Sequence, residues 1–447
     1  DMAPDEATAS AMAINNITDI DCGSTYSALP ESVERGLTTE ETVRRSVARV
    51  MLPLFEAGLF DGNRSRWSSL GVKDLAKHAA QAQDAASQSL VLLKNIGDIL
   101  PLPHGRKVAI VGPQAFNRAE LFGPTTIGPC TLNTSDDSLR GGYKENYDCI
   151  PNLHEALIAA GVASEIFAEM GCNLTDCAYQ GIDRAVRAAA AADFIVLALG
   201  TGLSTVDETE DLKSIRLSHG QELLAKAVSA LGKPVVVVLV MGNAMGIDTW
   251  IDDVPAVLHA FTPSGMWAAD TIVKALFGLG PARFGKLPYT LYPANYTSEV
   301  SVEGPSLVEG VGRTYRYYTG PVVFPFGFGL STTNFSLAQP SPTKITFSRQ
   351  DDTATVETQV RNIGRFEGDE VILLYFRPLN VSINAPLPRK QLVDFTRVAV
   401  PRGRSSAVLF RVKCSQISLV DSDGRRLLVP GDYELLLSNG VQEHHVS

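Results

Sequence analysis

Four short and nearly unbroken apolar runs in the middle of the chain constrain its fold more than any other feature. They are rich in valine, isoleucine and leucine, alternate with alanine-rich helical segments, and read KVAIVGP (107–113), ADFIVLALG (192–200), PVVVVLVMGN (234–243) and AVLHAF (256–261). Strands with this uniform apolar character are typical of a parallel sheet that helices cover on both faces. Residues 75–290 are therefore predicted to form an α/β domain with a mostly parallel sheet.

The segment before this domain is predicted to be helical. Residues 1–62 indicate two helices around a glycine-containing turn, and the second helix opens with Thr38 and Glu41 in capping-box spacing. Apolar side chains then recur at helical spacing, at Val43, Val47, Val50 and Leu54. Because nothing else in the chain is expected to cover this apolar face, and because the first residue is Asp, we expect a larger protein that begins upstream.

The pattern changes again after the α/β domain. Residues 291–340 lose the periodicity and gain proline, glycine and aromatic residues, as in GRTYRYYTGPVVFPFGFGLS (312–331), which indicates a linker or a functional loop. Residues 341–447 alternate apolar and polar side chains in ATVETQVRN, EVILLYFRP, SSAVLFRVK and DYELLLSNG. This alternation predicts a small antiparallel β-sandwich.

Charge and motifs restrict the expected partners. The 447 residues carry a formal net charge of −10, which argues against nucleic acid because phosphate binding needs a basic face. The longest apolar run is too short to cross a bilayer, so no membrane partner is expected. No C-x-x-C, H-E-x-x-H or G-x-G-x-x-G motif is present, and neither a metal nor an organic cofactor is expected.

Glycosylation sequons indicate a secreted, extracellular protein. Seven N-x-S/T sequons occur where random placement would give about two, at Asn16, Asn63, Asn133, Asn173, Asn295, Asn334 and Asn380. Six cysteines fit an oxidising compartment. Cys172 could pair with Cys177 and Cys130 with Cys149, whereas Cys22 and Cys414 lack local partners; free cysteines are the alternative.

One loop concentrates negative charge at the end of a buried strand. Asp207, Glu208, Glu210 and Asp211 fall within five positions of STVDETEDLKSIRLSHGQ (204–221), directly after the run that ends at Gly200. Ligands of open parallel sheets gather beyond the carboxyl ends of the strands. Neighbouring carboxylates raise one another's pKa, which suits a general acid. A solvated surface loop is the alternative, and composition alone favours it.

Other candidate side chains are predicted to be structural. His78, His154 and His219 occupy helical or loop positions and are interpreted as polar surface or core groups. Trp250 and Trp267 could stack on sugars, but buried core is the favoured interpretation.

Several segments together resemble glycoside hydrolase family 3, in its β-xylosidase branch. They are TDIDCGSTY (18–26), SQSLVLLKNIGDILPLP (87–103) and the 312–331 segment, in the order and spacing of the family over nearly all 447 residues. The resemblance implies a (β/α)8 barrel, an α/β sandwich and a fibronectin-III-like domain. Residues 1–62 would then be the C-terminal end of the barrel.

The resemblance also implies chemistry. Family members hydrolyse β-glycosidic bonds with retention, using an Asp nucleophile on the barrel and a Glu acid/base on a loop of the second domain. An ungapped register places Glu208 at the acid/base position, Asp211 at a loop-supporting Asp and Gln221 at the closing Gln, while Asp207 and Glu210 fall on variable positions. Leu212 stands where the family has Arg, and Ser218-His219 where it has Pro-Gly.

The same resemblance places the nucleophile upstream of residue 1. Asp19 and Asp21 belong to the later TDIDCGSTY signature and are not assigned as nucleophiles. Cys22 would pair with a cysteine beside that upstream nucleophile. The GLGPARFGKLPYTLYP segment (278–293) departs from the family's Asn-Pro-Gly-Gly turn at Ala282 and Arg283, which is expected to matter little for the chemistry.

The favoured hypothesis is a retaining exo-glycosidase that releases terminal β-1,4-linked xylose from xylo-oligosaccharides and that is inactive as these 447 residues alone. β-Glucosidase or α-arabinofuranosidase activity is an alternative within the family. A non-catalytic carbohydrate-binding or structural protein is the alternative outside enzymology.

Overall fold

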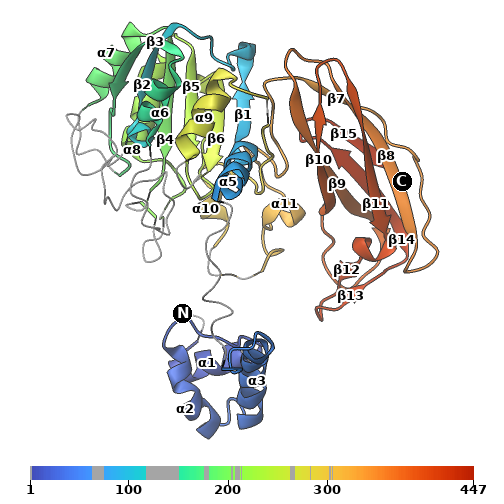
Figure 1. The fold of residues 1–447 in the computed structure, drawn as a ribbon. Coiled ribbons are helices and arrows are strands. Elements are labelled where there is room, and N and C mark those ends of the chain that lie inside the picture. The colour runs from blue at the N-terminus through green and yellow to red at the C-terminus, as the bar shows by residue number, and fades with distance from the viewer. Residues whose placement is uncertain are drawn as a thin grey trace. The chain divides into compact units, whose positions relative to one another are not determined.

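The computed structural model describes residues 3–62, 75–116, 151–175, 181–202, 205–206, 212, 214–261, 267–281, 283–301, 304 and 306–447 (Figure 1). These residues fall into two compact units, 1–78 and 79–447, each of which is described by itself. Within the described ranges, no helix combines the length and the apolar character needed to cross a membrane.

Residues 3–62 contain three α-helices rather than the two expected. They are α1 (Glu6–Asn15), α2 (Leu29–Glu34), which follows the 3-10 turn η1 (Thr25–Ala28), and α3 (Glu40–Glu56). The predicted capping box is wrong: Thr39 caps α3 by accepting a hydrogen bond from the Thr42 amide. Thr38 is buried and instead donates its hydroxyl to Asn15 Oδ1 at 2.7 Å, so a tertiary contact displaces the local one.

The four apolar residues predicted at helical spacing all lie in α3. Val47 and Leu54 are exposed, and Val43 and Val50 are half-buried.

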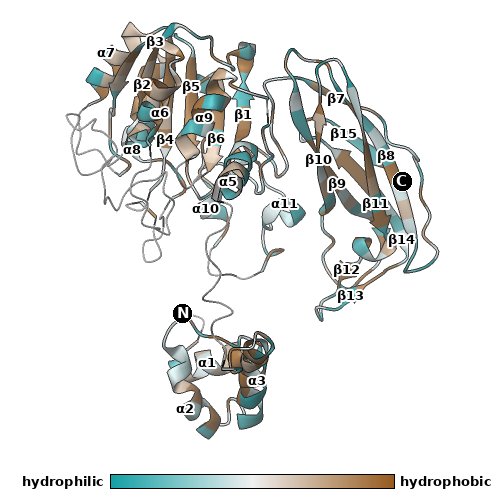
Figure 2. Ribbon diagram, viewed as in Figure 1, coloured by the Kyte–Doolittle hydropathy of each residue, from teal (hydrophilic) through white to brown (hydrophobic). Residues whose placement is uncertain are grey.

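The α/β prediction is confirmed. Among the described residues of the second unit, six strands form one sheet in the order β1-β6-β5-β4-β2-β3, with all neighbours parallel except β1 and β6. The strands are β1 (Val91–Asn95), β2 (Arg106–Val111), β3 (Ala163–Glu169), β4 (Phe194–Gly200), β5 (Val235–Val240) and β6 (Ala256–Phe261). All six residues of the central strand β5 are buried, and Figure 2 shows the hydrophobic character concentrated in these strands.

Helices cover both faces of this sheet (Figure 1). One face packs against α6 (Leu153–Ala160) and α9 (Ala268–Phe277), and the other packs against α7 (Ile182–Ala191) and α8 (His219–Ser229). Helix α5 (Leu75–Ser89) leads directly into β1, as the helical pattern before the apolar run predicted. Strand β3 was not anticipated, because it lies at the sheet edge and two of its residues are exposed.

The C-terminal residues form the expected antiparallel sandwich. In the described chain its two main sheets have the orders β10-β9-β14-β15 and β11-β8-β7. Strands β8 and β11 alternate buried and exposed side chains, which is the pattern that identified them in the sequence. The strands are β7 (Phe335–Leu337), β8 (Thr353–Asn362), β9 (Gly368–Val381), β10 (Gln391–Val400), β11 (Ser405–Lys413), β12 (Leu419–Val420), β13 (Arg426–Leu427), β14 (Gly431–Ser438) and β15 (Glu443–Val446).

The aperiodic segment between the two domains is ordered against the α/β domain. Its short helices are α10 (Tyr296–Glu299) and α11 (Thr314–Tyr317). Leu330 pairs with Leu92 of β1, and the Leu287 amide donates to the Phe328 carbonyl at 2.8 Å. The proline- and glycine-rich sequence therefore forms an irregular layer with backbone hydrogen bonds to its neighbours.

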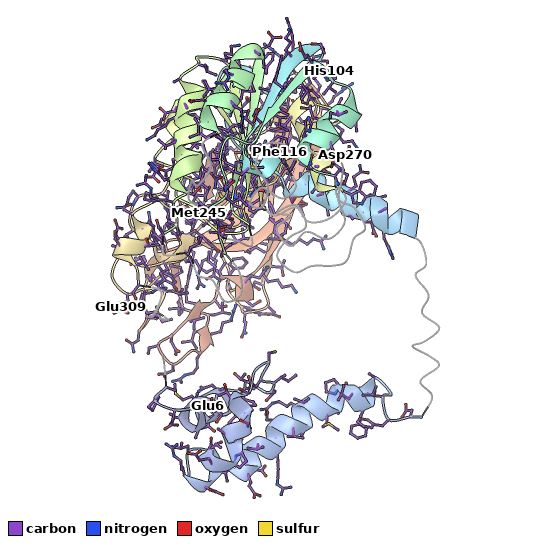
Figure 3. The ribbon with its side chains drawn as sticks, turned by 90° about the vertical axis from the view of Figure 1, so that its left-hand side faces the viewer. Glu6, His104, Phe116, Met245, Asp270 and Glu309 are labelled. Atoms are coloured by element: carbon purple, nitrogen blue, oxygen red, sulfur yellow. The ribbon has the colours of Figure 1, made fainter. Side chains whose placement is uncertain are left out.

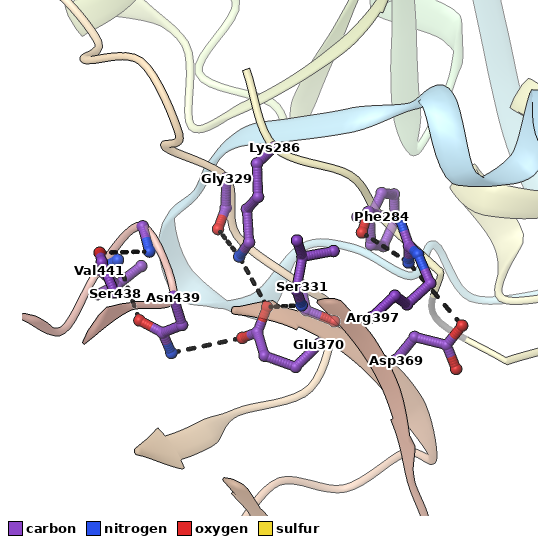
Figure 4. Close-up of polar contacts among 12 residues, drawn as sticks. Phe284, Lys286, Gly329, Ser331, Asp369, Glu370, Arg397, Ser438, Asn439 and Val441 are labelled. Carbon is purple, nitrogen blue, oxygen red and sulfur yellow. Dashed lines mark hydrogen bonds and ion pairs between the residues drawn. The ribbon is translucent and has the colours of Figure 1, made fainter. Parts of the chain in front are cut away.

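A cluster of ion pairs and hydrogen bonds, with the side chains of Lys286, Asp369 and Glu370 buried, joins residues 283–286 and Gly329 to the sandwich (Figure 4). Lys286 Nζ lies 2.8 Å from Glu370 Oε1 and donates to the Gly329 carbonyl at 2.7 Å. Arg283 pairs with Asp369 at 3.0 Å, and Arg397 donates to the Phe284 carbonyl at 3.2 Å. Because Glu370 and Asp369 start β9, these contacts fix the sandwich to the α/β domain.

Candidate functional site

The strand order defines a switch point at the carboxyl edge of the parallel sheet. Strand β2 has β3 on one side and β4 on the other, so the chain reverses its direction of travel across the sheet between β3 and β4. In open α/β sheets, the crevice beyond the carboxyl ends of two such strands is the usual ligand site. The segments that leave β2 and β4, which begin at Gly112 and Thr201, therefore bound the candidate site.

The acid-rich loop follows β4 at this edge. Asp207, Glu208, Glu210 and Asp211 lie outside the described residues, so their assigned roles stay predictions. The structure describes the two stems of the loop, which leave β4 at Thr201 and enter α8 after Ser218.

The departing stem needs a glycine at its base. A Cβ on Gly200 would lie 1.8 Å from the Val240 carbonyl oxygen of β5, and the residue has φ +153°. The backbone of β4 therefore ends against β5 more closely than any side chain permits. Gly112, at the end of β2, is in the same situation, since its Cβ would lie 2.2 Å from the Ala198 carbonyl oxygen.

Gln221 holds the two stems together. Its side chain is buried; Oε1 accepts from the Gly200 amide at 2.8 Å, and Nε2 donates to the Gly200 carbonyl at 2.9 Å. Nε2 also lies within hydrogen-bond distance of the Leu174 carbonyl at 3.1 Å. One amide in α8 thus satisfies backbone groups on two other segments, which explains why a glutamine closes this loop.

Gln114 provides a second fixed point that sequence reasoning missed. It is buried in the segment after β2, and its Nε2 donates to the Thr201 carbonyl at 2.7 Å. Thr201 Oγ1 donates in turn to Asn243 Oδ1 at 3.0 Å, beyond the end of β5. Carboxyl-terminal segments of three strands therefore converge on the first residue of the loop.

The returning stem is held by an ion pair. Arg216 lies 2.7 Å from Glu222 Oε2 and 3.2 Å from Glu222 Oε1, and Thr249 donates to the same carboxylate at 2.9 Å. The hydrogen bonds to Glu222 raise the pKa of Arg216. The backbone of this stem pairs with the segment after β5, because the Gly246 amide donates to the Ile215 carbonyl at 2.7 Å.

A pocket of about 260 Å³ lies between the stems. Its lining includes Thr175, Thr205, Leu212, Arg216 and Met245, the last of which is labelled in Figure 3. Leu212 is half-buried and packs against the apolar cluster beneath this face of the sheet. Leu212 therefore makes an apolar contact in the stem, at the position where the resemblance predicts an Arg.

Asp19 contacts helix α3, and Asp21 caps its own turn. Asp19 pairs with Arg49 at 2.6 Å and accepts from Ser46 Oγ at 2.8 Å, and these hydrogen bonds lower its pKa. Asp21 accepts from the Tyr26 and Gly23 amides at 2.9 and 2.8 Å, which lowers its pKa as well.

The remaining sequence candidates occupy structural positions. Trp250 is buried in the core and Trp267 is half-buried before α9. His154 is half-buried in α6, where burial lowers its pKa; His219 begins α8, and His78 is exposed in α5. Within the described ranges, no group of three or more His, Cys, Asp and Glu residues is placed to hold a metal ion.

The predicted modification sites are only partly described. Asn16, Asn295, Asn334 and Asn380 are exposed and Asn173 is half-buried, whereas Asn63 and Asn133 lie outside the described residues. Cys22 is exposed, Cys172 buried and Cys414 half-buried. Cys130, Cys149 and Cys177 lie outside the described residues, so the two disulfides stay predictions.

Comparison with known proteins agrees with this architecture. Residues 90–332 match the glycosyl hydrolase family 3 C-terminal domain, and residues 370–440 match the fibronectin type III-like domain. Beta-D-xylosidase 1 of Arabidopsis thaliana is 30% identical over 471 residues, which cover 97% of this chain and 58% of the relative.

Solved structures show the same relationship. A family-3 exo-β-xylosidase in complex with a xylobiose aziridine activity-based probe has a TM-score of 0.80 and 28% identity, over the whole of this chain and 58% of its own. A β-glucosidase of Erythrobacter marinus has a TM-score of 0.74 and 27% identity, over the whole of this chain and 60% of its own. The chain therefore spans less than two thirds of the length of these relatives. The chain belongs to glycoside hydrolase family 3.

Proposed function

We propose that the protein is a retaining exo-glycosidase that releases terminal β-1,4-linked xylose from xylo-oligosaccharides. The observation that carries the proposal is the acid-rich loop at the switch point of the sheet, with both stems anchored by Gln221. The xylosidase name of the Arabidopsis relative and the xylobiose-derived probe in the solved exo-β-xylosidase support xylose as the sugar.

Glu208 is proposed as the acid/base residue. It would protonate the leaving glycosidic oxygen and then deprotonate the water that releases the sugar. Retention requires a nucleophilic carboxylate about 5–5.5 Å away, which the loop must reach from the α/β domain. We assign that nucleophile to barrel residues outside these 447, and Asp211 to support of the loop. This two-carboxylate reaction uses neither a metal nor an organic cofactor.

The test is Glu208→Gln in the protein that includes the barrel, with Glu210→Gln as the matched control. Turnover of xylobiose, which has a poor leaving group, should fall about 10²- to 10⁴-fold in Glu208→Gln and little in Glu210→Gln. With an aryl xyloside that has a good leaving group, only deglycosylation should slow, and added azide should partly restore the rate. Wild-type turnover of xylobiose by Glu208→Gln would contradict the assignment.

A non-catalytic carbohydrate-binding protein is the second candidate, and the apolar residue Leu212 in place of the family's Arg is the observation that favours it. Inactivity of the full-length protein towards xylosides, β-glucosides and α-arabinofuranosides would select this alternative. Turnover of a β-glucoside or an α-arabinofuranoside in preference to a xyloside would support the glycosidase activity and reject xylose as its sugar.

We further infer an extracellular location, which the four exposed sequon asparagines support.

A further inference from the structure

A second pocket lies on the α/β domain between α5 and α9. Its volume is about 300 Å³, at the lower end of the range for small-molecule sites. It shares no lining residue with the pocket between the loop stems.

Polar links between neighbouring elements bound this pocket. Gln83 of α5 donates to Asp270 of α9 at 3.1 Å, and Asp270 pairs with Lys274 at 2.7 Å. Asp270 is labelled in Figure 3. Asp84, the next residue of α5, pairs with Arg283. The pocket is therefore a built feature in which side chains from three segments are held in place.

One buried hydroxyl in the wall of the pocket has no hydrogen-bond partner among the described residues. Thr271 lines the pocket and is only 4% exposed. Among the described residues its Oγ1 has no hydrogen-bond partner. Buried polar groups are almost always satisfied, so an unpaired hydroxyl in the wall of a pocket is a candidate contact for a ligand in that pocket. A hydroxyl that both donates and accepts is complementary to the hydroxyl of a sugar.

The charges around the pocket balance. Lys274 pairs with Asp270, and Arg283 pairs with both Asp84 and Asp369. Asp369 in turn lies 3.8 Å from Arg397, so each of these charges has an opposite partner and a strongly charged ligand gains little from the site. Apolar side chains line the rest of the wall, including Leu90, which is fully buried. Hydrogen-bonding groups of both kinds beside an apolar wall fit a neutral polyol, which presents hydroxyls at its edge and C–H groups on its face.

We propose that this pocket is a second carbohydrate site that binds one unit of a neutral xylo-oligosaccharide outside the catalytic centre. The choice of xylose rests on the proposed function. The site would hold a longer substrate on the α/β domain, and the pocket size suits about one sugar ring rather than a chain.

Titration of the 447-residue chain with xylotriose by calorimetry tests the site. We expect saturable binding with Kd of about 1 mM, as a small neutral ligand with few contacts implies. Thr271→Val keeps the shape but removes the hydroxyl, and it should weaken binding about five- to tenfold. Ala275→Phe should fill the pocket and abolish binding.

Thr290→Val is the matched control. Thr290 is equally buried, its hydroxyl also has no partner among the described residues, and it lies outside the pocket. It should leave the affinity unchanged, and melting temperatures of all variants verify folding. Absence of saturable binding, or equal affinities for Thr271→Val and the unaltered chain, would overturn the proposal.

Turnover of an aryl xyloside by the full-length protein separates this proposal from the proposed function. Thr271→Val should leave that turnover unchanged, because the pocket takes no part in the chemistry. Binding that depends on Thr271 without turnover would uphold the second site and reject the xylosidase. Turnover of the aryl xyloside without binding that depends on Thr271 would support the xylosidase and reject the second site.

Discussion

Lys286 and Glu370 join the α/β domain to the sandwich through an ion pair whose side chains are only 6% and 7% exposed. At their separation of 2.8 Å, the Coulomb attraction at an effective dielectric constant of 20 is about 6 kcal/mol. Most of this attraction is cancelled by the free-energy cost of removing both charges from water. We therefore expect Lys286→Met, which leaves a buried carboxylate without its cation, to lower the free energy of unfolding by about 3–5 kcal/mol.

A double-mutant cycle isolates the pair. Glu370→Gln alone should cost a similar amount, whereas the double variant should recover part of the loss, with a coupling energy of about 2 kcal/mol. Equilibrium unfolding in urea, followed by tryptophan fluorescence, measures each free energy through its midpoint and slope.

An exposed pair of the same chemistry supplies the control. Lys107 and Glu165 lie 2.9 Å apart, but both side chains are 50% exposed. Their cycle should give a coupling energy below about 1 kcal/mol, because water screens the charges. Additive losses in the Lys286–Glu370 cycle, or equal coupling in the two cycles, would refute the reasoning that burial makes the first pair strong.

Two further predictions concern buried polar groups of the α/β domain. Gln221→Leu should lower the free energy of unfolding by about 2–3 kcal/mol, because it removes the side-chain partners of the Gly200 amide and carbonyl in the interior. An unchanged urea midpoint would contradict the role of Gln221 in anchoring the loop stems. Burial lowers the pKa of His259, whose Nε2 lies 2.6 Å from Tyr289 Oη, to about 4. As the pH falls, the unfolded chain therefore binds the extra proton before the folded chain does. The free energy of unfolding should be full above about pH 6.5 and should fall by about 3 kcal/mol as the pH drops to about 4. In His259→Gln, the free energy of unfolding should depend less on pH over this range.

The architecture of the second unit was accessible from the sequence because its signals are local. Runs such as Val235–Val240 are apolar at every position, and the helical segments between such runs are recognisable by their high alanine content. Strands β8 and β11 were found by their alternation, which a sheet with one buried face imposes. Strand β3 was not predicted, because an edge strand with exposed residues shows neither a continuous apolar run nor a regular alternation.

The site was accessible only in part. The position of the acidic loop after Gly200, and the closing glutamine at Gln221, followed from the sequence and from family resemblance. Gln114 carried no usable signal, because a lone glutamine 87 residues from its partner Thr201 has no characteristic spacing. The cap of α3 was misplaced for the same reason, since Thr38 bonds Asn15 across the fold.

By itself, the sequence determined the α/β and β-sandwich classes and most of their strands and helices, because hydrophobic periodicity acts over a few neighbours. Only the tertiary structure decided the strand order that creates the switch point at β2 and β4, the glutamine contacts that anchor the loop, and the pairing of Lys286 with Glu370. Each of these joins residues far apart in the chain, where the free energy of burial and hydrogen bonding depends on the complete fold rather than on any local pattern.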